Sequence, residues 1–205
     1  MLGTVCMYPC NTPVPFKEEN IWSGFPEVTN APYGIAKRAL VEMCQAYNTQ
    51  YGMKNISVIP VNLVGPGEHF DLQNSHVIPS LIMKFASAIK NGDSKVEIWG
   101  TGKASREFLY VDDCSRGIIK AVECKTHAGP INLGTGKEIT IRKLVEMIAD
   151  IMGYKGKLVW DSSKPDGQPR RCLDVSLAKE VLVWEATTSL RDGIKNTVQY
   201  YEENY

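Results

Sequence analysis

Apolar and polar residues follow two kinds of pattern along this chain, one typical of strands and the other typical of helices. Residues 56–61 form an apolar run that only Ser57 interrupts, as in a strand buried on both faces of a parallel sheet. Ahead of that run, apolar residues recur at helical spacing from Ile35 to Tyr47, and Gly52 should end this helix at about Tyr51. Together with a strand at residues 2–7, the pattern predicts a βαβ unit with a right-handed crossover.

The alternation continues beyond residue 61, so the chain is predicted to be an α/β protein. We expect further strands at residues 96–99, 107–111, 131–133 and 157–160, and further helices at residues 77–90, 113–123, 141–152, 176–182 and 188–204. Residues 9–32, which contain five prolines, are expected to be an irregular surface excursion.

Composition narrows the possible partners. Of the 205 residues, 43% are hydrophobic, which is enough for a packed core, and the formal net charge is zero. Without a long basic run, nucleic acid is not an expected partner. Without a signal peptide or an apolar segment of membrane length, a membrane is not expected either. The six cysteines show no C-x-x-C pair, which argues against a disulfide framework or a zinc site and predicts a cytoplasmic protein.

Candidate chemistry begins with Tyr33 and Lys37, which are four residues apart on the predicted helix and should share one face. A nearby cation favours the phenolate form of a tyrosine, so this pair is a plausible proton relay, although such pairs also occur by chance on amphipathic helices. On the preceding strand, Thr4 and Cys6 should point to the same face because strand side chains alternate. A hydroxyl and a thiol would then lie together.

Seven short blocks carry a resemblance to a known family. They are Cys6-Met7-Tyr8-Pro9, Pro32-Tyr33-Gly34-Ile35-Ala36-Lys37, Asn62-Leu63-Val64-Gly65-Pro66, Asn74-Ser75-His76-Val77-Ile78-Pro79, Trp99-Gly100-Thr101-Gly102, Arg106-Glu107-Phe108-Leu109-Tyr110-Val111-Asp112-Asp113 and Ser163-Lys164-Pro165-Asp166-Gly167. In this order they resemble the extended short-chain dehydrogenase/reductases that act on nucleotide sugars. Within that family they are most similar to the branch that epimerises GDP-4-keto-6-deoxy-mannose at C3 and C5 and reduces it at C4 with NADPH.

The resemblance implies a fold and an assembly. Residues 1–65 should be part of a Rossmann-like parallel sheet that binds NADP and bears the tyrosine-lysine helix. Residues 66–205 should be mainly a smaller α/β domain for the nucleotide sugar, with some segments returning to the Rossmann sheet. The family pairs its subunits through the helix that bears Tyr33, so a homodimer is expected.

The resemblance also implies roles for the candidate residues. Inversion next to a ketone needs a base and an acid, and these would be Cys6 and His76. In the reduction, Tyr33 would donate a proton, Thr4 would hydrogen-bond the same oxygen, and Lys37 would support Tyr33. The cofactor contacts would come from Tyr33, Lys37, Asn62, Leu63 and His76. Simpler readings remain open: Cys6 as inert core, His76 as a capping or surface residue, and Leu63 as ordinary loop structure.

Five residues in the second half are candidates for binding the substrate. Lys84 and Arg106 would contact the diphosphate, and Trp99 would either flank the nucleotide or fill the core, with the core slightly favoured. Lys164 and Asp166 lie in a loop suited to wrapping a nucleotide, although charges in such a loop are usually just solvated. Asp112 and Asp113 are expected to cap the following helix and not to bind a metal.

One feature of the family is missing from the sequence as given. No Gly-rich strand-turn-helix, which holds the cofactor pyrophosphate, precedes Leu2. Gly100-Thr101-Gly102 and Gly134-Thr135-Gly136 are expected to be turns. We therefore expect these residues to be the C-terminal two-thirds of such an enzyme and to bind NADPH weakly by themselves. The alternatives are another nucleotide-sugar epimerase or 4-reductase of the family, or a non-catalytic nucleotide-sugar-binding fragment.

Overall fold

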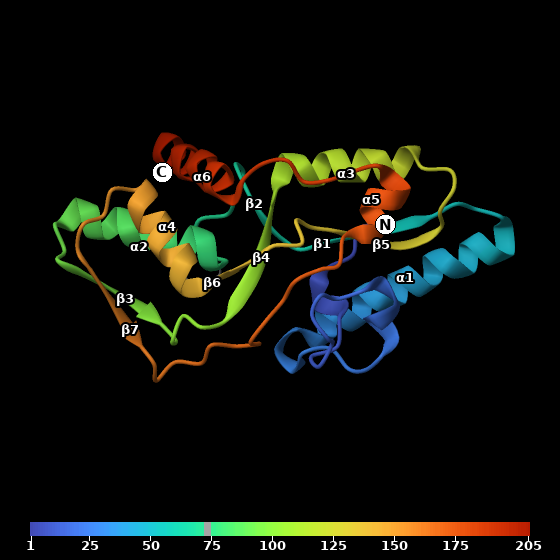
Figure 1. Cartoon of the computed structure of the whole chain (residues 1–205), viewed down its shortest axis with the longest axis horizontal. Coiled ribbons are helices and arrows are strands. Elements are labelled where there is room, and N and C mark those ends of the chain that lie inside the picture. The colour runs from blue at the N-terminus through green and yellow to red at the C-terminus, as the bar shows by residue number, and fades with distance from the viewer. Residues whose placement is uncertain (72–74) are drawn as a thin grey trace. The chain divides into compact units, whose positions relative to one another are not determined.

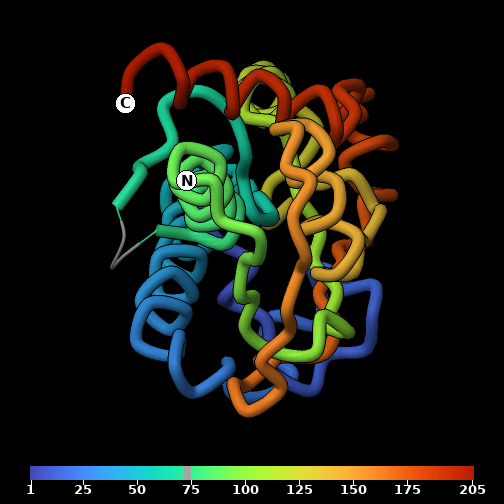
Figure 2. The backbone as a smooth tube through the Cα atoms, turned by 90° about the vertical axis from the view of Figure 1, so that its left-hand side faces the viewer, coloured from blue at the N-terminus to red at the C-terminus, as the bar shows by residue number. Residues whose placement is uncertain are grey.

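The computed structural model describes residues 1–71 and 75–205, and these form two compact units. Unit 1 comprises Met1–Leu63, Glu107–Glu138 and Arg171–Thr187, and unit 2 comprises Val64–Arg106, Ile139–Arg170 and Thr188–Tyr205. Figure 1 labels the elements and Figure 2 follows the backbone through both units. The assignment of residues 1–65 to cofactor binding and of residues 66–205 mainly to substrate binding stays a prediction.

Parallel strands form the centre of unit 1. Strand β1 (Ile56–Pro60) pairs with β5 (Gly129–Leu133), with Val58 opposite Ile131. The start of the chain adds to the other edge of β1, because Gly3 N donates to Val58 O at 2.7 Å and Val58 N donates to Met1 O at 2.9 Å. Helices α1 (Ala31–Tyr51) and α3 (Val111–Glu123) pack on β1, and α5 (Ser176–Leu182) packs on β5.

The predicted strand at residues 2–7 is wrong beyond residue 3. The hydroxyl of Thr4 accepts a hydrogen bond from Cys6 N at 3.3 Å, and the chain turns into a short 3-10 helix, η1 (Val5–Met7). Threonine offers its own side chain to the backbone in this way, in competition with strand pairing. Thr4 and Cys6 therefore do not share a strand face.

The proline-rich segment at residues 9–32 is anchored to unit 1 by buried side chains and backbone hydrogen bonds, which the sequence did not predict. It contains two 3-10 helices, η2 (Glu18–Trp22) and η3 (Val28–Asn30). Phe16 and Ile21 are fully buried. The backbone of Phe16 pairs with a segment from far along the chain, because Phe16 N donates to Cys172 O at 2.8 Å and Asp174 N donates to Phe16 O at 2.9 Å. Phe16 and Ile21 thus anchor this segment in the core of unit 1, while much of the rest of it is exposed, as expected.

Helix α1 ends as expected, at Gly52 with a φ of 65°. Its buried residues are Ala31, Gly34 and Val41. The apolar stripe that identifies the helix in the sequence lies on the other side: the exposed fractions are 44% for Ile35, 41% for Leu40, 53% for Met43 and 47% for Tyr47. The periodicity predicted the helix correctly but not the face that packs.

Unit 2 is built around a pair of parallel strands, β3 (Lys95–Trp99) and β7 (Lys157–Asp161). Helix α2 (Val77–Asn91) packs on β3 and on α4 (Ile141–Ile151), which also contacts α6 (Leu190–Asn204). Thr140 caps α4 as expected, since its hydroxyl accepts a hydrogen bond from Lys143 N. Fully buried side chains of this unit include Ile82, Phe85, Leu144 and Ile148.

A third sheet has the order β2-β4-β6. Strand β4 (Ser105–Tyr110) was predicted at residues 107–111, but β2 (Asn62–Val64) and β6 (Glu138–Thr140) were not predicted. Each of the latter has three residues, too few to show a period. Among the described residues, no helix is both long and apolar enough to cross a membrane.

Candidate active site

Helix α1 approaches the first residues of the chain very closely at Gly34. A Cβ atom at this position would lie 2.4 Å from the carbonyl oxygen of Cys6, so only glycine fits. Two side chains of α1 tie the segments together: Lys37 Nζ donates to Leu2 O at 2.9 Å and Arg38 Nε donates to Met7 O at 2.7 Å. The helix that bears the tyrosine-lysine pair is thereby fixed against residues 2–7.

Tyr33 and Lys37 lie as the helical spacing predicts. Lys37 Nζ is 5.8 Å from the centroid of the Tyr33 ring. The Tyr33 side chain is 51% exposed, so its hydroxyl is accessible to a ligand. Thr4 and Cys6 are half-buried on the segment that α1 contacts. Four of the five candidate catalytic residues therefore come together in unit 1.

The candidate cofactor residues Asn62 and Leu63 follow β1 on β2. Asn62 Nδ2 donates to the carbonyl oxygen of Glu107 at 3.0 Å, which fixes this residue to β4. Leu63 is 39% exposed, so an apolar side chain is accessible at this point.

Glu107 is a fully buried carboxylate that sequence reasoning treated only as part of a motif. Its Oε1 accepts hydrogen bonds from Thr135 N and, at 2.7 Å, from Gly136 N. Its Oε2 accepts one from Leu173 N at 2.7 Å. Burial raises the pKa of the Glu107 carboxyl above its ordinary value, although these backbone N–H groups act in the opposite direction. The side chain joins β4 to two loops of unit 1.

Replacing Glu107 with glutamine should destabilise the protein by about 1–3 kcal/mol, because the amide nitrogen would face an N–H group and leave it without an acceptor. Denaturant unfolding of the full-length protein would measure the change. Glu180→Gln, at an exposed position of the same unit, is the matched control. Equal stability of the Glu107 and Glu180 variants would contradict the role of this carboxylate.

The raised pKa also predicts a pH dependence. The native state binds a proton at Glu107 more tightly than the unfolded chain does, so stability should fall as pH rises from about 4.5 through the raised pKa. Glu107→Gln lacks this titration. The unfolding free energy of the wild type minus that of the variant should therefore decrease with pH in this window, and a difference that rises with pH would contradict the sign.

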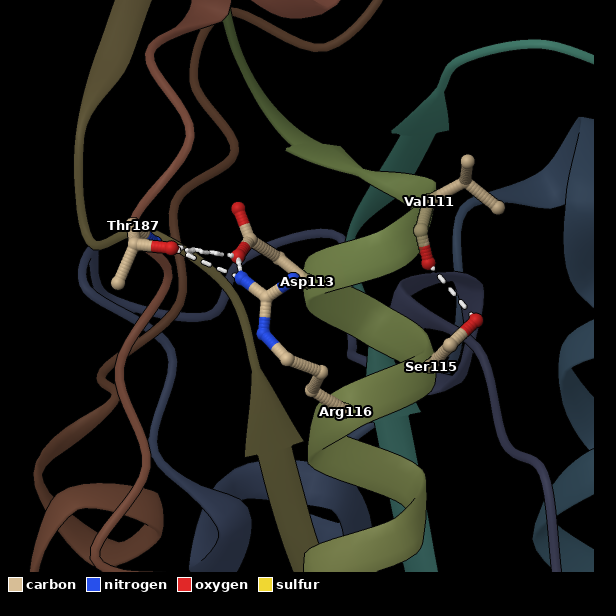
Figure 3. A network of polar contacts seen from close by, with 5 residues as sticks. All are labelled: Val111, Asp113, Ser115, Arg116 and Thr187. Carbon is tan, nitrogen blue, oxygen red and sulfur yellow. Dashed lines mark hydrogen bonds and ion pairs between the residues drawn. The ribbon is translucent and has the colours of Figure 1, made fainter.

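Asp113 forms a second buried polar cluster in unit 1. Asp112 and Asp113 were expected to cap the following helix, and this prediction is wrong, because the N-cap residue of that helix is Tyr110. Asp113 Oδ1 accepts hydrogen bonds from Thr187 N at 3.2 Å and from the Thr187 hydroxyl at 3.1 Å, and it pairs with Arg116 (Figure 3). Helix α3 begins after Tyr110 without a side-chain cap. Asp113 thus holds the segment that ends unit 1.

His76, the remaining candidate catalytic residue, belongs to unit 2 and immediately precedes α2. Its side chain is 89% exposed, and Nδ1 lies 3.5 Å from Glu68 Oε1. His76 occupies the N-cap position of α2 but makes no capping bond through its side chain, and its exposure agrees with the alternative of a surface residue. Asn74, which belongs to the same sequence block, lies outside the described residues.

Three candidate substrate residues gather at the end of β3 in unit 2. Trp99 is 63% exposed, so the prediction that it fills the core is wrong. Strand alternation explains this, because Val96 and Ile98 take the buried positions. The Nζ atoms of Lys84 and Lys164 each lie 5.4 Å from the centroid of a Trp99 ring, a distance at which a cation is attracted to the aromatic face.

Arg106 and Asp166 are engaged with protein groups. Arg106 Nη1 donates to Ser105 O and to Gln168 O, both at 2.7 Å. Asp166 accepts two hydrogen bonds from Thr101, at 2.7 Å from the backbone N–H and at 2.5 Å from the hydroxyl. Both residues connect the loop that follows β7 to other parts of unit 2.

Sequence reasoning missed two residues that build the site. Arg38 donates to Met7 O and to Gly24 O, and nothing in its spacing indicates this. Gly34 did offer a signal, because glycine within a helix costs about 1 kcal/mol relative to alanine and needs a packing reason.

Comparisons with known proteins show which family the chain belongs to. The model of the NAD dependent epimerase/dehydratase family matches residues 1–134. The chain is 43% identical to "Probable GDP-L-fucose synthase 1" of Oryza sativa subsp. japonica, covering 99% of this chain and 62% of that protein. It is 42% identical to "GDP-L-fucose synthase" of Escherichia coli (strain K12), covering 99% and 66%.

A solved structure is similar as well. The crystal structure of a GDP-L-fucose synthetase from Naegleria fowleri bound to NADP superposes with a TM-score of 0.90 at 30% identity, covering 100% of this chain and 65% of that one. The chain thus spans a little under two thirds of the length of the proteins it matches.

Proposed function

We propose that this chain, which belongs to the NAD dependent epimerase/dehydratase family, carries the catalytic residues of a GDP-L-fucose synthase. The whole enzyme inverts C3 and C5 of GDP-4-keto-6-deoxy-mannose and reduces C4 with NADPH. The observation that carries the proposal is the contact of α1 with residues 2–7, where Gly34 lies against the carbonyl oxygen of Cys6 and Lys37 donates to Leu2 O. This contact would hold Tyr33 near Thr4 and Cys6.

Epimerisation uses the acidity of the protons next to the C4 ketone. The Cys6 thiolate removes the proton from C3 or C5, and the electron pair moves into an enolate. His76 then returns a proton to the opposite face of the same carbon, which inverts it without any net change in oxidation state. The exposure of the His76 imidazole supports this assignment, because an exposed side chain is accessible to a ligand.

Reduction uses residues of unit 1. Tyr33 and Leu63 are both partly exposed, so a phenol and an apolar side chain would be accessible to the nicotinamide end of the cofactor. Lys37 and Asn62 complete the set that would hold the cofactor, together with His76. When bound, NADPH supplies a hydride to the C4 carbon. Tyr33 donates its proton to the carbonyl oxygen, the Thr4 hydroxyl hydrogen-bonds that oxygen, and the Lys37 charge stabilises the resulting phenolate.

The nucleotide end is assigned to unit 2. Lys84 and Lys164 beside the exposed Trp99 offer positive charge next to an aromatic face, which suits a guanine nucleotide diphosphate. Arg106 adds a guanidinium group at the start of β4. Asp166 completes the candidate set.

The decisive experiment is product analysis. Full-length protein incubated with GDP-4-keto-6-deoxy-mannose and NADPH in deuterated water should give GDP-L-fucose that carries deuterium at C3 and C5. Reduction without deuterium at these carbons would instead identify a 4-reductase of the same family. Absence of NADPH oxidation would overturn the proposal.

The enzyme is proposed to be a homodimer that pairs through α1. The exposed stripe of Ile35, Leu40, Met43 and Tyr47 supports this, since a contiguous apolar face of this kind marks an interaction surface. A cytoplasmic location is part of the proposal, because the cysteine spacing is not that of a disulfide framework.

Replacing Met43 with glutamate should weaken the dimer about 100-fold or more, because burying an unpaired carboxylate costs several kcal/mol. Sedimentation of the full-length protein at several concentrations would measure the change. Thr49→Glu adds the same charge at an exposed position of α1 outside the stripe and should leave the dimer intact. A Met43→Glu protein that remains dimeric would exclude this face as the interface.

A further inference from the structure

The turn after β3 has an unusually restricted backbone. Gly100 and Gly102 have φ values of 86° and 75°, a region in which residues with side chains are strained. A Cβ atom at Gly100 would also lie 2.4 Å from Asp166 Oδ1, and one at Gly102 would lie 2.7 Å from the Trp160 ring. The Gly-Thr-Gly turn is therefore shaped by close contacts on both sides of Thr101.

Thr101 is held from two directions. Asp166 accepts from its backbone N–H and from its hydroxyl, and these bonds keep the pKa of the Asp166 carboxyl below its ordinary value. From the other side, Arg142 Nη2 donates to Thr101 O at 2.9 Å. The Arg142 guanidinium is itself placed by the Trp160 ring, whose centroid lies 4.3 Å away. Each oxygen of the Asp166 carboxylate thus accepts a hydrogen bond from Thr101.

The same bonds help to position Lys164, whose own backbone N–H donates to Asp161 O at 3.3 Å. The loop between β7 and Arg170 is connected at its far end to β4, where Ser105 N donates to Pro169 O at 2.9 Å and Arg106 holds Gln168 O. Between these ends, Asp166 connects the loop to Thr101, two residues beyond Trp99. Lys164 is two residues before Asp166, and its Nζ lies near the Trp99 ring.

We propose that Asp166 is a positioning residue that clasps Thr101 and so holds Lys164 and Trp99 together as one surface for the nucleotide diphosphate. It acts through these two residues and does not contact the ligand. This assignment rests on the proposed function, and it replaces the expected role of Asp166 as a substrate contact.

Four variants of the full-length protein distinguish a clasp from a contact, with GDP as the probe and calorimetry as the measurement. Asp166→Ala loses both bonds to Thr101 and should raise the Kd for GDP about tenfold. Thr101→Val loses the hydroxyl bond and should raise it about threefold. The double variant should bind GDP no more weakly than Asp166→Ala alone, because the hydroxyl bond lost in Thr101→Val is already lost in Asp166→Ala. Asp166→Asn can still accept from Thr101 N and donate to the hydroxyl, so its Kd should stay within about twofold of wild type.

A direct contact gives a different pattern. Asp166→Asn would then weaken GDP binding as much as Asp166→Ala, and Thr101→Val would leave it unchanged; either result overturns the clasp. Asp93→Ala, which removes an exposed carboxylate of the same unit, is the control for charge.

Turnover separates positioning from damage to the fold. Asp166→Ala should raise KM for the nucleotide sugar about tenfold and leave kcat within about twofold, because the clasp acts on binding. A fall in kcat with KM unchanged would overturn the assignment. Wild-type protein that binds no GDP would overturn the proposed function, and this inference with it, whereas ordinary wild-type binding with an unaffected Thr101→Val would overturn the inference alone.

Discussion

Tyr33→Phe should lower kcat for NADPH oxidation by about 100- to 10,000-fold, the range that a positioned acid or base contributes. The phenylalanine ring keeps the packing of α1, and only the proton donor is lost. The half-exposed position of Tyr33 and the nearby Lys37 support a direct role in protonating the C4 oxygen. The full-length enzyme with saturating GDP-4-keto-6-deoxy-mannose and NADPH is the system in which to measure it.

Tyr51→Phe provides a control on the same helix, since this side chain is 63% exposed at the end of α1. It should leave kcat unchanged. A Tyr33→Phe enzyme with kcat within about tenfold of wild type would contradict the assignment of Tyr33 as the proton donor.

Cys6→Ala and His76→Ala should each slow solvent exchange at C3 and C5 by about 100-fold or more, because each removes one partner of a proton transfer. Tyr33→Phe should leave this exchange largely intact, since epimerisation needs no hydride. Deuterium incorporation into the keto-sugar, followed without NADPH, measures this step alone. The two half-reactions would then be assigned to different side chains on one scaffold.

Cys10→Ala, at an exposed thiol four residues beyond Cys6, should exchange like the wild type. Full deuterium incorporation at both carbons in Cys6→Ala would show that another group is the base. If Cys6→Ala lost exchange while His76→Ala exchanged normally, the assignment of Cys6 as the base would stand and that of His76 as the acid would be excluded.

The elements with strong periodicity were the ones that the sequence predicted well. Helix α2 differs by one residue at its end, and α4 starts where Thr140 caps it. The strand prediction was wrong at residues 4–7 because the Thr4 side chain accepts a hydrogen bond from a backbone N–H. The pattern of hydrophobic residues does not encode such a bond. The α1 stripe showed a helix but could not show which face packs, since an apolar face can meet a core or another subunit equally well.

The candidate site likewise contains residues that the sequence predicted and residues that it did not. Tyr33 and Lys37 were found because a single helix sets their spacing. Trp99 was predicted to fill the core, although the alternation of side chains along β3 puts it on the exposed face. Glu107 could not be found, because its partners Thr135 and Leu173 are distant in sequence and only the folded chain brings them together.

The pairing of Phe16 with residues 172–174 affects how the protein is made. During synthesis at about 5–20 residues per second, the segment around Cys172 leaves the ribosome roughly 8 to 31 s after Phe16. For that time the proline-rich segment lacks the backbone partner that it has in the finished fold. Unit 1 therefore completes its core late, after most of unit 2 has been translated, and nascent chains that stall before residue 172 should depend on chaperones to protect Phe16 and Ile21.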